Sequence, residues 1–452
     1  MRGNLSQYWR CPEPYVRIAI AGDLSGEKGY FRFGPDTLYG RSVTARPAAE
    51  VAEPLLDLRD SVRLEAGTVL LPFDLDEVVD NLRQELYAAD STWGNRVTDI
   101  YYFLRPILPV DIRKYLQRAR LRQWDKIRFP QWPVDRTVDD LMAQSLTLLL
   151  RAGGLSQIPF IWFWPENAQS CAVMTHDVET NAGVDLCPAL MDMDDAFGMP
   201  ASFQVVPEER YRVQPAFLDS LRSRGFEVVV HDLNHDGHLF RSRQRFAERV
   251  SRINAYGKQF GATGFRAGVL YRNQRWFDLL DFEYDMSVPN VAHLDPQRGG
   301  CCTVMPYFVG KVLELPVTTT QDYSLFHILK DYSTTLWEQQ IEMIMEKHGL
   351  ISMIAHPDYL AGEREKRVYE ALLAHLAKLR ALRQLWITTP GEVNRWWRQR
   401  AAMEIVEVNG KLQIEGPGKE RASIAYASEN NGRLEFDLQP VARQVSTSYC
   451  PS

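Results

Sequence analysis

The feature that most constrains the fold is an alternation of short apolar runs with helix-like segments between residues 168 and 400. Apolar runs of four to eight residues, each followed by an amphipathic stretch, are typical of parallel strands joined by helices. This many repeats predict an α/β fold with a (β/α) barrel. The predicted strands are Cys171–Thr175, Ala201–Val206, Phe226–Val230, Gly261–Arg266, Glu283–Met286, Val312–Val317, Ile351–Ala355 and Leu385–Thr388.

Apolar residues at helical spacing fill the intervals between these strands. The predicted helices are Pro188–Ala196, Pro215–Ser223, Ser242–Phe260, Gln274–Leu280, Thr334–Lys347, Glu363–Leu382 and Gly391–Gln399. In barrels of this kind the chemistry lies at the carboxyl ends of the strands. Asp177, His231, Arg266 and His356 all stand at or directly after a predicted strand end, so we expect a functional site there.

Two further regions flank the predicted barrel, as a chain of 452 residues leads one to expect. Residues 1–165 read as an N-terminal α/β domain of unknown role, joined to the barrel by a linker at Ile158–Asn167. Residues 402–452 read as a small β appendage of two hairpins, with a disordered tail after Pro440. The N-terminal elements are predicted as strands Tyr15–Ala21 and Thr68–Leu71, and as helices Leu75–Ala88, Pro109–Arg122 and Val138–Arg151, the last capped by Thr137.

Composition excludes several classes of partner. The net charge of −6 gives no reason to expect binding to nucleic acid or to an anionic membrane. No apolar run approaches the length of a membrane span, and the N-terminus holds no signal-peptide core. The six cysteines form no CxxC pair, and adjacent Cys301 and Cys302 make a poor disulfide. We therefore predict a cytoplasmic protein with reduced thiols.

The segment Thr175-His176-Asp177-Val178-Glu179 ends one of the apolar runs. Alternate residues of an extended chain face the same side, so Asp177 and Glu179 should point together and His176 away. Two acids beside a divalent cation divide the work, one binding the metal and the other serving as a general base. The competing interpretation is that Asp177 caps a turn and Glu179 is solvated. His176 is interpreted as a core or supporting residue.

His231 and His235 form a His-x-x-x-His pair after the third predicted strand. On a helical turn, side chains four residues apart share a face, and both imidazoles can then reach one cation. We interpret the pair as metal ligands, against the alternative of two structural histidines. His238 is expected to be a supporting or exposed residue, and His293, His327, His348 and His375 are interpreted as structural.

Arg266 and His356 follow two later strands. Arg266 could orient a carboxylate, although from the residues alone a surface arginine is the favoured interpretation. His356 is a candidate general acid and needs a carboxylate to hold and charge it. Asp285 and Asp322 both lie in or just after strand-like segments, and the sequence does not choose between them.

Taken in order, these motifs resemble the polysaccharide deacetylase (NodB-homology) family of metal-dependent carbohydrate esterases. That family carries Thr-Phe-Asp-Asp, His-x-x-x-His, Arg-x-Pro and Leu-x-His. This chain offers Thr175–Val178, His231–His235, Arg266–Gly268 and the strand that ends in His356. It is most similar to the divergent branch whose first motif reads Thr-His-Asp-Val-Asp/Glu. The resemblance covers roughly residues 168–400 and neither flank.

The resemblance implies a distorted (β/α) barrel with a divalent metal, most often zinc. Asp177 would be the base, His231 and His235 metal ligands, Arg266 the residue that orients Asp177, and His356 the general acid. Two positions depart from the family pattern. Val178 stands where a metal-binding aspartate is expected, so Glu179 would replace it. Gly268 stands where the third motif has proline.

These expectations lead to one main hypothesis, a hydrolase that removes N-acetyl groups from an amino-sugar glycan or its precursor. The segment Ala355-His356-Pro357-Asp358 also echoes a motif of a different zinc deacetylase fold. There, however, the motif follows the first strand and contains a second acid, for which Tyr359 stands here. The non-enzymatic alternative is a glycan-binding or scaffold protein with a degenerate barrel, and Val178 is its best support.

Overall fold

The fold is taken from a computed structural model, which describes residues 3–43, 47–88 and 121–439. The helix predicted at Pro109–Arg122 lies almost entirely outside the described residues, and so does the tail after Pro440. Among the described residues, no helix combines the length and apolar character needed to cross a membrane.

A nine-stranded sheet forms the larger half of the molecule. Its strand order is β12-β13-β11-β10-β9-β8-β7-β14, with β15 paired to β7, and every pairing is parallel except that of β12 with β13. Each of the predicted barrel strands is present, which confirms an α/β fold with a distorted barrel. The strands are β7 (Ser170–Val178), β8 (Ala201–Val205), β9 (Glu227–His231), β10 (Gly264–Arg266), β11 (Tyr284–Asp285), β12 (Tyr307–Val309), β13 (Val312–Glu314), β14 (Leu350–Ala355) and β15 (Leu385–Ile387).

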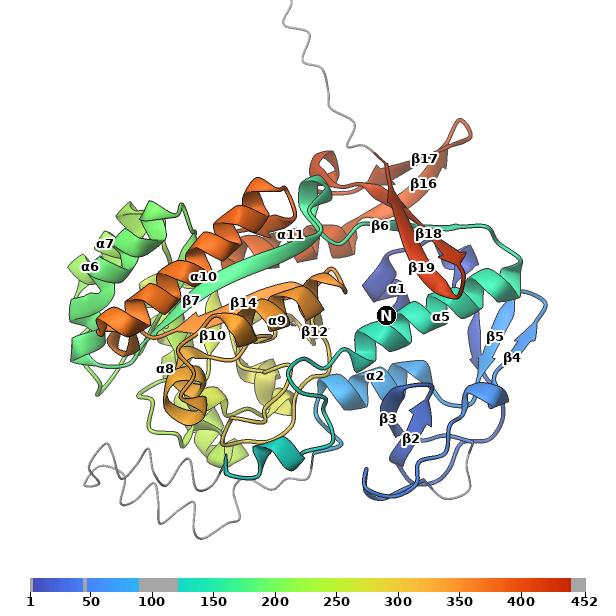
Figure 1. Ribbon diagram of the computed structural model, residues 1–452, viewed down its shortest axis with the longest axis horizontal. Helices are drawn as coiled ribbons and strands as arrows, with labels where there is room; N and C mark the ends of the chain where they lie inside the picture. Colours follow the sequence, from blue (N-terminus) through green and yellow to red (C-terminus); the bar gives the residue numbers. More distant parts are fainter. Residues whose placement is uncertain (1–2, 44–46, 89–120, 440–452) are drawn as a thin grey trace, which may run out of the picture.

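Helices cover the outer face of this sheet, as the left half of Figure 1 shows. Their apolar faces join the buried side chains of the strands in one core. Three of the helices have side-chain caps, since Thr180 Oγ1 accepts the Gly183 amide, Ser242 Oγ the Arg245 amide and Thr389 Oγ1 the Glu392 amide. The helices are α6 (Asn181–Ala196), α7 (Pro215–Ser223), α8 (Arg243–Phe260), α9 (Thr335–Met345), α10 (Glu363–Ala381) and α11 (Pro390–Ala402); Gln274–Leu279 is a 3₁₀ helix.

The sheet does not close into a barrel through a continuous backbone ladder. Along the edge of β14, the Thr318 hydroxyl donates to the Leu350 carbonyl at 2.7 Å, and the Thr319 hydroxyl donates to the Ser352 carbonyl at 2.8 Å. The Ser352 amide in turn donates to Thr318 Oγ1 at 2.9 Å. We call this side-chain contact between residues 318–322 and β14 the seam.

The N-terminal region packs beside the barrel, on the right of Figure 1. Its buried side chains, among them Leu38, Val78 and Leu146, belong to an apolar cluster that also includes residues of the large sheet. Helix α5 begins at Thr137 itself, so the predicted cap is off by one residue, and Asp135 accepts the Thr137 amide at 2.9 Å. The elements are α1 (Asn4–Trp9), β1 (Ile18–Ile20), β2 (Gly29–Phe33), β3 (Asp36–Gly40), β4 (Arg63–Glu65), β5 (Thr68–Leu71), α2 (Leu75–Arg83) and α5 (Thr137–Gly153).

The segment predicted as a linker contains a buried strand, β6 (Ile158–Ile161). It pairs with β18 (Ile424–Asn430), which forms a hairpin with β19 (Arg433–Leu438). The linker prediction is therefore wrong there, because a partner strand far along the chain satisfies the backbone of β6. The other predicted hairpin is present as β16 (Glu404–Val408) and β17 (Lys411–Glu415).

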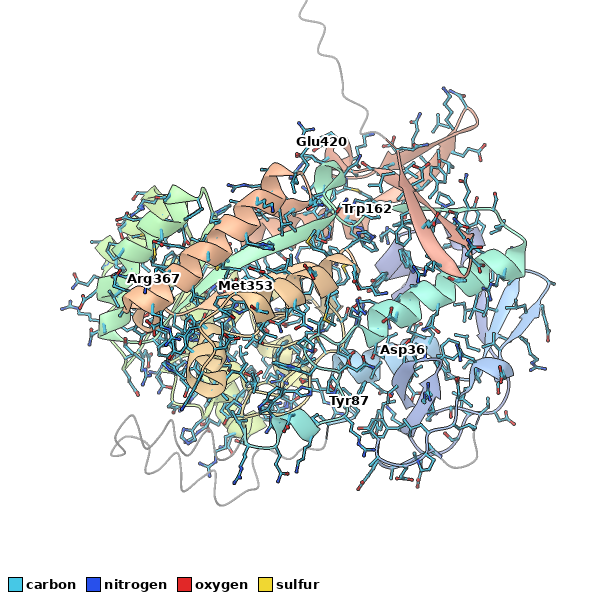
Figure 2. The ribbon with its side chains drawn as sticks, viewed as in Figure 1. Asp36, Tyr87, Trp162, Met353, Arg367 and Glu420 are labelled. Carbon is cyan, nitrogen blue, oxygen red and sulfur yellow. The ribbon has the colours of Figure 1, made fainter. Side chains whose placement is uncertain are left out.

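The N-terminal region also contacts loops that leave the carboxyl ends of the barrel strands. The Tyr87 hydroxyl, labelled in Figure 2, donates to the Gly300 carbonyl at 2.6 Å. Asp139 accepts the Thr303 hydroxyl at 2.8 Å, and the Asp135 amide donates to Asn290 Oδ1 at 2.8 Å. The region is thus attached to the end of the barrel where the predicted site residues lie.

Candidate metal and catalytic centre

The end of β7 presents its two acids to one side, as strand alternation predicts. Asp177 is 4% exposed and faces Arg266 of β10. His176 faces the opposite side of the sheet, where its Nε2 lies 2.8 Å from Asp194 of α6. Glu179 follows the last strand residue and points to the same side as Asp177.

Arg266 is fully buried, and its hydrogen bonds hold it in place. Its Nη1 donates to Asp177 Oδ1 at 2.6 Å and to Thr175 Oγ1 at 2.8 Å, while Nε donates to the Met286 carbonyl at 3.1 Å. Burial raises the pKa of Asp177, but the positive charges of Arg266, His231 and His356 outweigh it and lower the pKa below its usual value. Asp177 is therefore an ionised carboxylate whose Oδ1 is engaged by Arg266.

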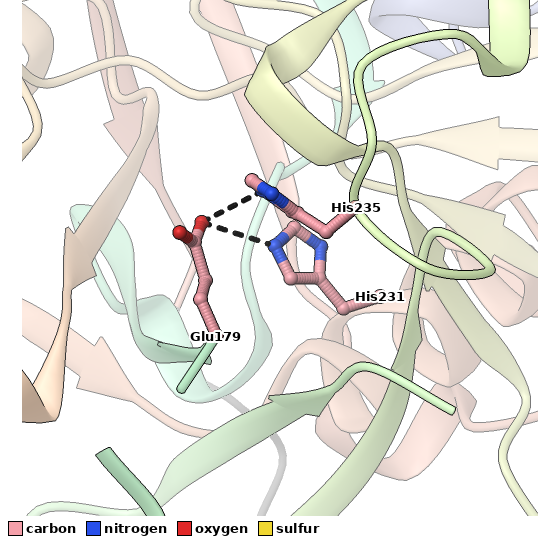
Figure 3. Close-up of side chains that lie close together, drawn as sticks. All are labelled: Glu179, His231 and His235. Carbon is pink, nitrogen blue, oxygen red and sulfur yellow. Dashed lines mark ion pairs between the residues drawn. The ribbon is translucent and has the colours of Figure 1, made fainter. Parts of the chain in front are cut away.

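Glu179, which follows β7, converges with His231 and His235, which lie at and just after the end of β9 (Figure 3). Glu179 Oε1 lies 2.8 Å from His235 Nε2 and 3.5 Å from His231 Nε2. Both Nε2 atoms are buried, and neither has a partner with hydrogen-bond geometry among the described residues. Buried polar atoms normally find partners, and two histidines with one glutamate are a donor set that zinc uses in hydrolases. These residues therefore fit a divalent cation.

The local structure of the histidine pair differs from the sequence prediction. His231 is the last residue of β9, and its Nδ1 lies 3.1 Å from the Arg266 carbonyl. His235 sits in a loop with φ of 52°, and Asp232 also has a positive φ of 56°. The expected helical turn is wrong, because a tight left-handed bend brings the two imidazoles together. His238 contacts Asp236, at 3.5 Å.

The two departures from the family pattern have physical explanations. Val178 is fully buried among apolar side chains of the core, and it faces away from the acids of the site. A side chain at Gly268 would collide with the loop, because an added Cβ would lie 2.5 Å from Asp232 Oδ2 and 2.8 Å from His235 Cδ2. The absence of a side chain at Gly268 thus leaves room for the loop that contains His235.

His356 takes its carboxylate partner from across the seam. Its Nδ1 lies 2.6 Å from Asp322 Oδ1, and its amide donates to Asp322 Oδ2 at 2.6 Å. Burial lowers the pKa of His356, but the charges of Asp322 and Glu179 raise it well above its usual value. His356 Nε2 points into the cluster, 3.5 Å from Glu179 Oε1. Of the two open candidates, Asp322 is the one that contacts His356.

Asp285, the other candidate, belongs to a separate buried pair. It accepts the amide and hydroxyl of Ser287 at 2.7 and 2.8 Å, and it lies opposite Glu314 in the register of β11 and β13. Burial and the neighbouring Asp285 raise the pKa of Glu314 well above its usual value. The Ser287 hydroxyl in turn accepts the Ala267 amide at 2.8 Å. The pair therefore supports the loop after Arg266 rather than His356.

Comparison with known proteins gives results only at the level of structure. No family model matches the chain, and no curated protein matches it. Among solved structures, a Mycobacterium smegmatis protein assigned as a polysaccharide deacetylase is 18% identical, with a TM-score of 0.44, covering 53% of this chain and 93% of that one. The peptidoglycan deacetylase PdaC from Bacillus subtilis is 14% identical, with a TM-score of 0.34 and coverages of 53% and 96%.

One further similar structure is not named as a deacetylase. Puue allantoinase is 12% identical, with a TM-score of 0.41 and coverages of 52% and 92%. Solved polysaccharide and peptidoglycan deacetylases are thus among the structures that this chain is similar to.

Proposed function

We propose that the chain is a metal-dependent hydrolase that removes N-acetyl groups from an amino-sugar glycan or glycan precursor. The observation that carries this proposal is the convergence of Glu179, His231 and His235, with Asp177 and His356 both beside Glu179. A bound divalent cation, most simply zinc, would supply Lewis acidity at the amide carbonyl. Glu179, His231 and His235 would hold it.

Asp177 has the geometry of the general base. Arg266 engages Oδ1, which leaves Oδ2 toward the ligand cluster, 3.7 Å from His231 Nε2. Its lowered pKa keeps it ionised at neutral pH, so it can accept a proton from the water that attacks the acetamide carbon. Arg266 acts here as a positioning residue, since it contacts Asp177 and not the reacting atoms.

His356 has the properties of the general acid. Asp322 holds Nδ1 and, with Glu179, favours the protonated imidazole, so Nε2 carries a proton directed at the cluster. When the carbon–nitrogen bond breaks, that proton passes to the leaving nitrogen, and acetate and a free amine are released. The proposed base and the proposed acid both lie beside Glu179, with candidate ligand atoms within 4.8 Å of one another.

The experiment is acetate release from N-acetylglucosamine oligomers by the purified full chain. We expect turnover that is lost on chelation and restored by zinc. Absence of acetate release from zinc-loaded protein would contradict the proposal. Failure to bind zinc at all would instead favour the non-catalytic, glycan-binding alternative.

A further inference from the structure

We propose that the N-terminal region contributes a second sugar subsite beside the catalytic centre, in which a sugar ring stacks on Trp132 and one of its hydroxyl-bearing arms enters a small polar cavity. This inference rests on the proposed glycan deacetylase function. The subsite would bind a sugar of the substrate other than the one that is deacetylated.

The cavity lies beside the loops that carry the catalytic groups. Among its lining residues are Leu270 and Gln321. Leu270 is two residues beyond Gly268, which touches the His235 loop, and Gln321 directly precedes Asp322, the partner of His356. Leu270 also packs in a small apolar cluster with Ile354, two residues before His356. A chain bound at the catalytic centre therefore has the cavity as a near neighbour.

Trp132 is the contribution of the N-terminal region to this cavity. It is half-buried, with Trp124 packed edge-on at 4.9 Å between ring centroids. The next residue, Pro133, is fastened to the barrel because Gln340 Nε2 donates to its carbonyl at 3.0 Å. The indole is thus held in place before any ligand arrives, which reduces the entropy cost of binding.

The lining offers both the apolar surface and the hydrogen-bonding groups that a sugar contacts in a binding site. Trp132, Leu294 and Val291 offer apolar surface, and the negative face of an indole attracts the weakly positive C–H bonds of a sugar ring. Thr320, Gln321 and Ser324 offer hydrogen-bonding groups.

Ser324 supplies an independent sign of a ligand. It is 1% exposed, and its hydroxyl oxygen has no hydrogen-bond partner among the described residues. A buried hydroxyl without a partner is costly. The enclosed space is about 20 Å³, enough for one hydroxyl-sized group but not for a ring. A hydroxyl or hydroxymethyl arm fits this space while the ring remains on Trp132.

The charges of the lining residues indicate which class of sugar the cavity would bind. Among the residues that the structure describes, the lining includes one acid, Asp295, and no lysine, arginine or histidine. Asp295 already accepts a hydrogen bond from Gln321 Nε2 at 3.0 Å. Nothing in the lining would compensate a phosphate or a uronate, so the subsite should prefer a neutral sugar.

The test compares a β-1,4-linked N-acetylglucosamine tetramer with the monomer as substrates. Trp132→Ala removes the stacking surface, and Ser324→Val fills the cavity with methyl groups. We expect each variant to lower kcat/KM for the tetramer by about three- to tenfold, the size of one aromatic contact. The value for the monomer should stay within about twofold. A tetramer-to-monomer ratio equal to that of the wild type in Trp132→Ala would overturn the proposal.

Trp386→Ala is the matched control, since Trp386 is also half-buried but lies on β15, at the amino end of β7. It should leave the tetramer-to-monomer ratio unchanged. Tetramer binding to Asp177→Asn protein, measured by calorimetry, separates the two proposals. If the wild type releases no acetate, the proposed function fails. The subsite would still be supported if adding Trp132→Ala, but not Trp386→Ala, weakened tetramer binding.

Discussion

Buried carboxylates occur in two parts of the sheet with opposite surroundings. At the end of β7, Asp177 lies 2.6 Å from Arg266, and Glu179 lies 2.8 Å from His235. On β11 and β13, Asp285 and Glu314 lie opposite one another instead. Asp177, Asp285 and Glu314 are all buried, yet the pKa of Asp177 is lowered whereas burial raises the pKa of both Asp285 and Glu314.

The charge of the neighbouring side chains therefore decides which of these buried carboxyl groups can act as a base or as a metal ligand. A guanidinium or imidazole keeps the group ionised, so that it can accept a proton or bind a cation. Where the neighbour is a second carboxyl, as Asp285 is for Glu314, the pKa rises and the protonated group, which can donate a hydrogen bond, is favoured. Changing one member of each set tests this distinction.

The largest effect is expected from Asp177→Asn. The amide cannot accept the proton of the attacking water, so acetate release should fall by about a thousandfold or more. Steady-state assays of acetate release measure this loss. Zinc content and circular dichroism should match the wild type, because an amide can still accept the bond from Arg266. Equal rates for the two proteins would remove Asp177 from the mechanism.

The second-largest loss of activity is expected from Glu179→Gln, because this change would weaken metal binding. Replacing the charged ligand is expected to weaken zinc binding by about a hundredfold, with activity regained only at high zinc concentration. Competition with a chromogenic chelator gives the affinity. Glu392→Gln, at a half-buried side chain of α11, should leave it unchanged. Unaltered zinc affinity in Glu179→Gln would mean that this side chain is not a ligand.

A smaller effect is expected from Asp322→Asn, which acts through His356. The neutral amide no longer favours the imidazolium, so the pKa of His356 should fall from its raised value. Since the proposed acid is the protonated form, activity is lost as pH rises through that pKa. The alkaline limb of the kcat profile should therefore shift to lower pH, with kcat at pH 8 reduced by about ten- to a hundredfold. If the alkaline limb did not shift, Asp322 and His356 would not be the groups that deliver the proton.

The smallest effect on activity is expected from Glu314→Gln, within about threefold. Its effect should appear in stability. The raised pKa of Glu314 means that the unfolded chain ionises first, so this residue costs stability as pH rises above about 4.5. Glu314→Gln should lose less stability between pH 5 and pH 8 than the wild type, by about 1 kcal/mol or more. Urea unfolding at the two pH values measures this, with Glu407→Gln on β16 as control.

The sequence predicts well those features that depend on neighbouring residues. The alternation along β7 places Asp177 and Glu179 on one side and His176 on the other, as the structure confirms. The apolar runs likewise locate every strand of the large sheet except β12, the antiparallel edge strand. In each case the signal lies within a few residues, where strand geometry alone decides the outcome.

Features that depend on distant contacts were not predictable in the same way. The side chains of Asp232 and His235 occupy the place that a side chain at position 268, on another loop, would need. The choice of Asp322 over Asp285 depends on which segment crosses to β14. The strand β6 was mistaken for a linker because its partner, β18, lies near the end of the chain. A fixed spacing in the sequence carries none of this information.

The seam has a consequence for motion. On the β14 edge that faces residues 318–322, Thr318, Thr319 and Asp322 supply side-chain bonds where a paired strand would supply a regular ladder. Amides held in this way should exchange with deuterated solvent sooner than those on the edge that β7 covers. Opening of this edge would free the Ser352 and His356 amides and separate Asp322 from the imidazole at the same time.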